Sequence, residues 1–213
     1  MTSTIEVLLA ARRIADFAVQ EGALLEQRVP RPTCQHMGAI IADAILQAGL
    51  NYSTVVRPRV IAILQEFPDE ITTSNLIRLI EKRQTPLFLN WNNSIKIERF
   101  ERLVEFLYQR NIEHVAELQE KLAYDTFCAE MQNVNGVGPK TVDYLACLVG
   151  LDSIAVDRHI RNFARRTGIN DESYKFLHTV FCCAADLLAL PRRDFDAWVW
   201  SKEASSTQLT LSL

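Results

Sequence analysis

The stretch that decides the fold is Met131–Ile169, which reads MQNVNGVGPKTVDYLACLVGLDSIAVDRHIRNFARRTGI. Gly136 and Gly138 interrupt an otherwise helical pattern, and Pro139 follows at a position where proline favours the first turn of a helix. This order predicts a tight helical hairpin, whose glycines permit positive φ and let another backbone come close. The amides at the start of the second helix favour an anion such as a phosphodiester. The hairpin alone fits a plain connection between two helices equally well.

Lys140 is placed in the first turn of this second helix. The positive end of the helix dipole disfavours an ammonium there and so favours the neutral amine. A neutral amine is a nucleophile, and its attack on a sugar carbon gives a Schiff base. The alternative reading, commoner for a single lysine at such a position, is a solvated charge or a phosphate contact.

Asp157 precedes Arg158 and is predicted to be the N-cap of a helix from Arg158 to about Thr167. Backbone amides keep a capping carboxylate ionised. The same carboxylate can therefore stabilise positive charge that develops on a sugar, or orient a proton transfer, without giving up its capping role.

Charge is distributed unevenly along the chain. The net charge of −3 over 213 residues argues mildly against a nucleic-acid partner. However, residues 158–166 contain four arginines and no acid, whereas residues 113–130 contain five acids and one lysine. A basic helix is often only a solvated face. Beside an amide-lined hairpin, it predicts a track for phosphates.

The rest of the pattern is helical, and it predicts an all-α protein. Strand-like alternation never lasts more than four or five residues. A cap at Thr73 or Ser74 and a loop over Pro86–Asn93 are expected. Val29–Pro32 is expected to be a linker between lobes. Apolar residues recur at helical spacing in Ile5–Val19, Met37–Ala48, Arg57–Phe67, Leu76–Lys82 and about Ser94–Gln109, with room for three more helices between Pro139 and Pro191.

Composition excludes several classes of protein. With 48% hydrophobic and 23% charged residues and only 7 Gly and 7 Pro, the chain is neither collagen-like nor largely disordered. No apolar run is long enough to cross a bilayer, and Arg12 and Arg13 follow the apolar residues of the N-terminus, unlike a secretory signal. We therefore expect a cytoplasmic protein. Five cysteines without a C-x-x-C pair predict reduced thiols.

The hairpin residues resemble the helix-hairpin-helix DNA glycosylase superfamily, which includes endonuclease III and 8-oxoguanine DNA glycosylase. Residues 136–141 read GVGPKT, and VDRH follows at 156–159. This order is similar to the family pattern L-P-G-V-G-x-K-T-A followed by V-D-x-H. Weaker similarity extends to Ala39–Tyr52 and Asn92–Leu107, which resemble an early barrel helix and the helix after the DNA-wedge loop.

The resemblance implies two all-α lobes with a cleft between them. One lobe is a helical barrel over residues 32–151 that contains the hairpin at 134–140. The other lobe is built from residues 1–31 and 152–213. Lys140 and Asp157 would then face each other across the cleft. They match the family's catalytic lysine, which marks enzymes that also nick the strand by β-elimination, and its catalytic aspartate.

The resemblance also implies how the protein would hold DNA. His159 matches a residue that contacts phosphate, and we expect the hairpin amides at Gly136, Val137 and Gly138, with Arg158 and Arg161, to add to it. Carbonyls of Gln132, Val134 and Val137 match positions that hold a structural cation, here expected to be monovalent. An iron–sulfur cluster is not expected, because Cys182 and Cys183 are adjacent and cannot supply the four-cysteine spacing of endonuclease III.

The residues that would read the base or fill the DNA gap are less well defined. Tyr144 lies one turn beyond Lys140, so the two share a helix face. Phe195 and Trp198 are further candidates for the base pocket, although aromatic residues at helical spacing more often belong to a core. Trp91, in the Leu87–Trp91 loop, is a candidate wedge or an anchor of that loop. Asn51 lies near Gly49, which replaces the gap-filling glutamine of endonuclease III, with Gln47 and Tyr52 close by.

Three functions remain open from the sequence. The first is a base-excision repair enzyme that acts as a monomer on double-stranded DNA containing a damaged base or an abasic site. It would combine DNA glycosylase and lyase activities, and it requires neither an organic cofactor nor a membrane. The second is a DNA-binding helix-hairpin-helix protein without catalysis. The third is an α-helical interaction protein.

Overall fold

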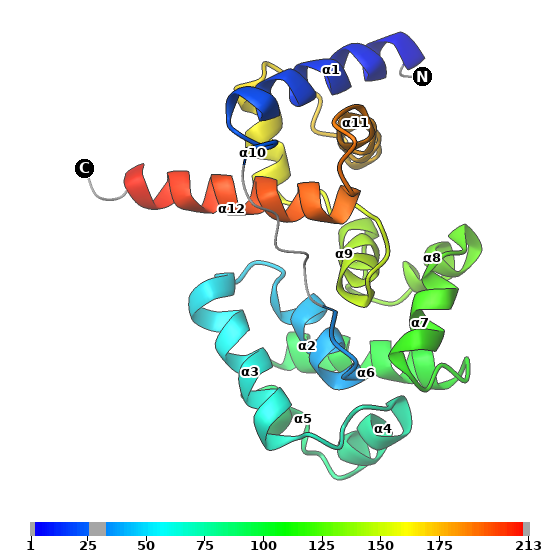
Figure 1. Ribbon diagram of the computed structural model, residues 1–213. Coiled ribbons are helices and arrows are strands. Elements are labelled where there is room, and N and C mark those ends of the chain that lie inside the picture. The colour runs from blue at the N-terminus through cyan, green and yellow to red at the C-terminus, as the bar shows by residue number, and fades with distance from the viewer. Residues whose placement is uncertain (1–2, 26–32, 211–213) are drawn as a thin grey trace. The chain divides into compact units, whose positions relative to one another are not determined.

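A computed structural model describes residues 3–25 and 33–210, with side chains to residue 204. The chain divides into two compact units, Met1–Pro32 with Asp152–Leu213 (unit 1) and Thr33–Leu151 (unit 2). Every regular element in the described ranges is helical, so the all-α prediction is confirmed (Figure 1). None of these helices is both long and apolar enough to span a membrane. The linker predicted at Val29–Pro32 falls outside the described residues.

Unit 1 is built from the two ends of the chain. Its helices are α1 (Thr4–Gln20), α10 (Arg158–Arg166), α11 (Tyr174–Leu187) and α12 (Arg192–Thr210). α1 begins with a capping box, in which the Ser3 side chain accepts from the Ile5 amide and Glu6 accepts from the Ser3 amide. The buried face of α1 is made mainly of alanines, so this helix approaches α11 closely (Figure 1).

An ion pair joins α10 to α12 at the edge of this core. Arg166 Nη1 lies 2.8 Å from Glu203 Oε1, and the Glu203 side chain is 5% exposed. Arg166→Met would leave this buried carboxylate without its guanidinium, so we expect the free energy of unfolding to fall by about 2–3 kcal/mol. This loss is smaller than for a fully buried pair, because the Arg166 side chain is itself partly exposed. The exposed pair Arg12–Asp16 is the matched control, since Arg12→Met should cost below about 0.5 kcal/mol. Urea unfolding of both variants measures the difference, and equal costs would contradict it.

Unit 2 is a bundle of helices from a continuous stretch of chain (Figure 1). Its apolar core includes Phe88, Phe100 and Ile41, each with at most 1% exposure. The central helix α2 is buried along its whole length, and α3, α4, α6 and α9 pack around it. The elements of this unit are α2 (Met37–Leu46), η1 (Tyr52–Val56), α3 (Arg57–Glu66), α4 (Thr73–Glu81), α5 (Thr85–Phe88), α6 (Ser94–Tyr108), α7 (Val115–Leu122), α8 (Asp125–Met131) and α9 (Pro139–Val149).

Local details differ from the sequence predictions in two places. The N-cap of α4 is Thr72, whose side chain accepts from the Asn75 amide, so the prediction of Thr73 or Ser74 was wrong. Thr73 instead donates its hydroxyl to the Ile112 carbonyl at 2.7 Å, a tertiary contact that no local pattern reveals. The loop predicted over Pro86–Asn93 begins with the short helix α5, whose first turn contains Pro86.

Candidate functional site

The glycine hairpin joins α8 to α9 in unit 2. Gly136 has φ +87°, which favours glycine, whereas Gly138 is extended with φ −100° and ψ −179°. Only the first glycine therefore needs positive φ. Val137, between them, is 2% exposed and anchors the turn. Gly138 is the N-cap of α9 and Pro139 opens it, as the sequence predicts.

Two residues at the end of α2 and the start of α9 meet beside the hairpin. Lys140, half-buried in the first turn of α9, donates from Nζ to Gln47 Oε1 at 3.1 Å. Gln47 follows the last residue of α2, and its Nε2 is buried without a hydrogen-bond partner in the described part of the chain. An amide oxygen accepts a hydrogen bond from a charged ammonium and from a neutral amine alike. The contact with Gln47 therefore orients Nζ in either protonation state of Lys140.

A buried carboxylate lies one turn further along the same interface. Asp43 of α2 is 4% exposed, and it accepts the hydroxyls of Tyr144 at 3.1 Å and Tyr52 at 3.3 Å. Tyr144 is itself 9% exposed. Tyr144, the predicted base-pocket residue, is thus held through its hydroxyl, one turn from Lys140. Asp43, which holds it, is a buried polar group that the sequence analysis did not single out.

Asp157 lies in unit 1 and begins α10. Its Oδ1 accepts from the amides of His159 at 2.7 Å and Ile160 at 3.1 Å, which confirms the predicted N-cap. The side chain is partly exposed. The carboxylate therefore uses one oxygen for these two amides, and its position is fixed by the start of the helix.

The basic helix offers less free charge than its sequence suggests. Arg165 and Arg166 pair with Glu172 and with Glu21 and Glu203, all in unit 1. Arg161 donates to the Glu172 carbonyl, and Arg158 Nε lies 3.3 Å from His159 Nε2. Of the arginines in the predicted phosphate track, Arg158, which is exposed, and Arg161 therefore remain the candidates for phosphate contacts.

His159 and the C-terminal aromatic residues pack inside unit 1. The His159 ring is 5% exposed and lies edge-on to Trp200, with 5.6 Å between ring centroids. Phe195 is fully buried in the core of unit 1 and stacks on Trp198 at 6.0 Å. The structure thus corrects the base-pocket interpretation of Phe195: it is a core residue. Trp198 is only partly buried and remains a prediction, as does the phosphate contact of His159.

The residues expected near the DNA gap lie in two places of unit 2. Trp91 packs under Arg59, whose guanidinium carbon is 4.9 Å from the ring centroid, and Arg59 also donates to the Asn90 carbonyl. These contacts favour the anchoring interpretation of Trp91. Leu87, in α5, is 67% exposed and is the more accessible apolar side chain of that loop. Asn51 is the N-cap of η1, and its Oδ1 accepts from the Thr54 amide at 3.0 Å.

The fold is similar to that of a solved structure. One similar chain comes from a structure described as a trapped endonuclease III–DNA covalent intermediate in an estranged-adenine complex, with a TM-score of 0.50 and 17% sequence identity. The match covers 92% of this chain and 86% of that chain. The chain has an endonuclease III-like fold. No family model and no curated protein sequence matches it.

The cation site predicted at the hairpin stays a prediction. The carbonyls of Gln132, Val134 and Val137 belong to the hairpin between α8 and α9. The Val134 carbonyl accepts the Val137 amide at 2.9 Å and retains one lone pair. If a monovalent cation binds there, these carbonyls are the groups that would hold it. Within the described ranges, no cluster of His, Cys, Asp or Glu side chains is arranged for a metal ion.

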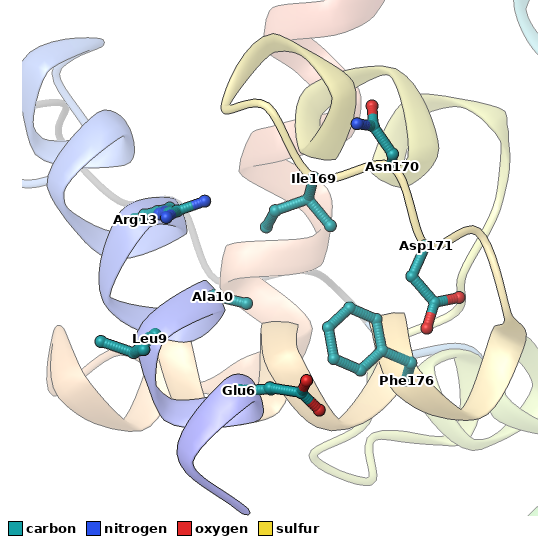
Figure 2. Close-up of a pocket in the computed structure, with 8 residues that line it drawn as sticks. All are labelled: Glu6, Leu9, Ala10, Arg13, Ile169, Asn170, Asp171 and Phe176. Atoms are coloured by element: carbon teal, nitrogen blue, oxygen red, sulfur yellow. The ribbon is translucent and has the colours of Figure 1, made fainter. Parts of the chain in front are cut away.

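Unit 1 of this endonuclease III-like fold also has a cavity of about 550 Å³ between α1 and the start of α11 (Figure 2). Leu9 and Phe176 give it an apolar side, and Arg13 and Asp171 give it opposite charges. Glu6 lines it too, but its carboxylate is engaged by the Ser3 amide. Neither Lys140 nor Asp157 lines this cavity.

Three residues near Lys140 were missed by the sequence reasoning. Asp43 is the single acid in the apolar helix α2, and Lys96 occupies the apolar stripe of α6 four residues before Phe100. Such breaks in a buried face are visible in the sequence. Arg99 gives no such signal. Its side chain covers Gly136 so closely that a Cβ on this glycine would collide with it.

Proposed function

We propose that this protein is a DNA glycosylase with lyase activity that repairs damaged bases in double-stranded DNA. The observation that carries this proposal is the position of Lys140. Its amine is in the first turn of α9, beside a glycine hairpin, and it is oriented by Gln47 at 3.1 Å. The endonuclease III-like fold supports the same proposal, since the similar structure is a covalent protein–DNA intermediate.

Lys140 is the proposed nucleophile. The neutral amine attacks C1′, and the bond between C1′ and the damaged base breaks as the base leaves with the electron pair and takes up the proton that the amine loses. The C1′–O4′ bond then breaks, O4′ takes up a proton, and the opened sugar carries an iminium between C1′ and Lys140. At an abasic site, the amine condenses with the C1′ aldehyde to an iminium and releases water. Loss of a C2′ proton then expels the 3′ phosphate, which cuts the strand.

Asp157 is proposed to assist the departure of the base. Its carboxylate is held at the N-terminus of α10 by the amides of His159 and Ile160. A fixed negative charge stabilises positive charge developing on the sugar and can accept or direct a proton.

The test is a panel of duplex oligonucleotides treated with borohydride, which delivers hydride to the iminium carbon and makes the complex permanent. The panel contains uracil, oxidised guanine, an oxidised pyrimidine and an abasic site, each with an undamaged control. We expect a trapped complex with the abasic duplex and with at least one damaged base. Duplex binding without base release or trapping on any member would favour the DNA-binding protein without catalysis. Binding that does not weaken with rising salt would favour the interaction protein.

The hairpin glycines give a test of DNA binding that is separate from catalysis. A Cβ at Gly138 would meet no atom within 4 Å, so Gly138→Ala should leave the free energy of unfolding within about 0.5 kcal/mol of the wild type. If a phosphate approaches the amides there, the added methyl group obstructs it, and duplex affinity should fall about tenfold. Fluorescence anisotropy with undamaged duplex measures the affinity.

Gly136→Ala is the matched comparison. Its positive φ and its contact with Arg99 make any side chain strained, so we expect a loss of stability of about 1–2 kcal/mol. A Gly138→Ala variant that binds duplex as tightly as the wild type would argue against phosphate binding at this hairpin.

A further inference from the structure

Lys96 is a buried lysine with no role in the reaction steps proposed for Lys140 and Asp157. It lies in the first turn of α6 and is 9% exposed. Its Nζ lies 2.6 Å from the Ile45 carbonyl and 2.7 Å from the Ala48 carbonyl, with the Leu46 carbonyl at 3.5 Å. These carbonyls lie at the end of α2, where the helix dipole is negative. Lys96 therefore caps α2 from another helix.

The capped segment also carries the partner of Lys140. Gln47 lies between the carbonyls that Lys96 holds, and its Oε1 accepts from Lys140 Nζ at 3.1 Å. Gln47 Nε2 is buried with no hydrogen-bond partner among the described residues, so the contact with Lys140 is the hydrogen bond that orients this amide. Any shift of this helix end would move the group that orients the amine.

Charge links the two lysines as well. Burial lowers the pKa of Lys96 to about 8, and the positive charges of Arg99 and Lys140 contribute to this lowering. A repulsion between two ionisable groups acts equally on both. The charge of Lys96 therefore disfavours a charge on Lys140, and a neutral amine is the form that reacts.

Carboxylates on the helices around Lys140 act in the opposite direction, since a negative charge favours the charged amine. Asp43 of α2 already accepts the hydroxyls of Tyr144 and Tyr52. Asp143 lies on the next turn of α9. Helix α7 also packs against α9, and its Gln119 lies beside Gly150 at the C-terminal end of α9.

We propose that Lys96 is a positioning residue for Lys140: its ammonium fixes the end of α2 that presents Gln47, and its positive charge favours the neutral amine at Lys140. This proposal rests on the proposed function, because the amine matters only if it reacts. A purely structural Lys96 would cap α2 equally well but would show no electrostatic coupling to Lys140.

The deciding experiment measures that coupling without any catalysis. Full-length protein labelled with ¹³C at lysine Cε is titrated by NMR, and Lys96 is assigned by the resonance lost in Lys96→Arg. We expect Lys96 to titrate near pH 8 in the wild type, and its midpoint to rise by about half a pH unit in Lys140→Gln, because one repelling charge is gone. Lys121→Gln, an exposed change on α7, is the matched control and should leave the midpoint in place.

The second arm follows the pH profile of borohydride trapping on an abasic duplex. In Lys96→Gln, the acid limb of the profile should move to higher pH by the same half unit, with trapping at pH 7 falling about threefold and recovering at pH 9. Lys96→Arg keeps the charge and should restore most of the wild-type profile. Because each variant is compared with itself at two pH values, partial unfolding does not imitate the result.

The outcomes separate the two proposals. An unchanged Lys96 midpoint in Lys140→Gln, or a Lys96 that titrates like a free lysine, would overturn the role of Lys96. Wild-type protein that traps no substrate at any pH would instead overturn the proposed lyase activity, while the NMR arm still decides whether the two lysines are coupled.

Discussion

Lys140→Gln is expected to abolish the borohydride-trapped complex and to lower strand scission at abasic sites by about 10³-fold or more, because the nucleophile is removed. The change is mild for the fold. Lys140 is half-buried in the first turn of α9, and a glutamine amide there can still reach Gln47. Duplex affinity should fall only by the loss of one positive charge, which anisotropy at several salt concentrations measures.

Two controls make this result specific. Lys121→Gln removes an exposed lysine of the same unit and should trap like the wild type. Lys140→Arg keeps a positive charge but offers no neutral amine at neutral pH, so it should bind and fail to trap. Trapping that survives in Lys140→Gln would show that another amine is the nucleophile.

Asp157→Asn is expected to lower base release by about 10²–10⁴-fold while leaving the fold intact. Asparagine caps helices as well as aspartate does, so the hydrogen bonds to the amides of His159 and Ile160 are retained. What is lost is the negative charge. Single-turnover release of the damaged base found in the panel measures the rate.

Asp157→Ala separates the two roles of this carboxylate. It removes both the charge and the cap, so it should match the Asn variant in rate and in addition lose about 1 kcal/mol of stability. Asn activity equal to the wild type, with only the Ala variant impaired, would reduce Asp157 to a helix cap.

The features that the sequence predicted well depend on neighbours in the chain. The hairpin, the opening of α9 at Pro139 and the cap at Asp157 each follow from a few consecutive residues with a specific backbone requirement. The all-α class follows in the same way from repeated helical spacing. Such signals survive because no tertiary contact is needed to produce them.

The features that the sequence missed depend on contacts between distant segments. Lys96 reaches carbonyls about fifty residues earlier, and Asp43 meets a hydroxyl about a hundred residues later. Phe195 has the spacing of a pocket residue and of a core residue alike, and only the packing of unit 1 assigns it to the core. The ion pairs of the basic helix are hidden from the sequence for a similar reason, since the partners of Arg166 lie in α12 and just after α1.

The division of the chain sets an order for its synthesis. Unit 2 is one uninterrupted segment, so all its contacts are available once Leu151 has left the ribosome. Helix α1 is translated before unit 2 but packs on α11, which is translated only after the whole of unit 2. During that interval its alanine-rich face, centred on Ile14, has no partner from unit 1. Helix α1 is therefore made before unit 2 but reaches its native packing only after unit 2 is complete.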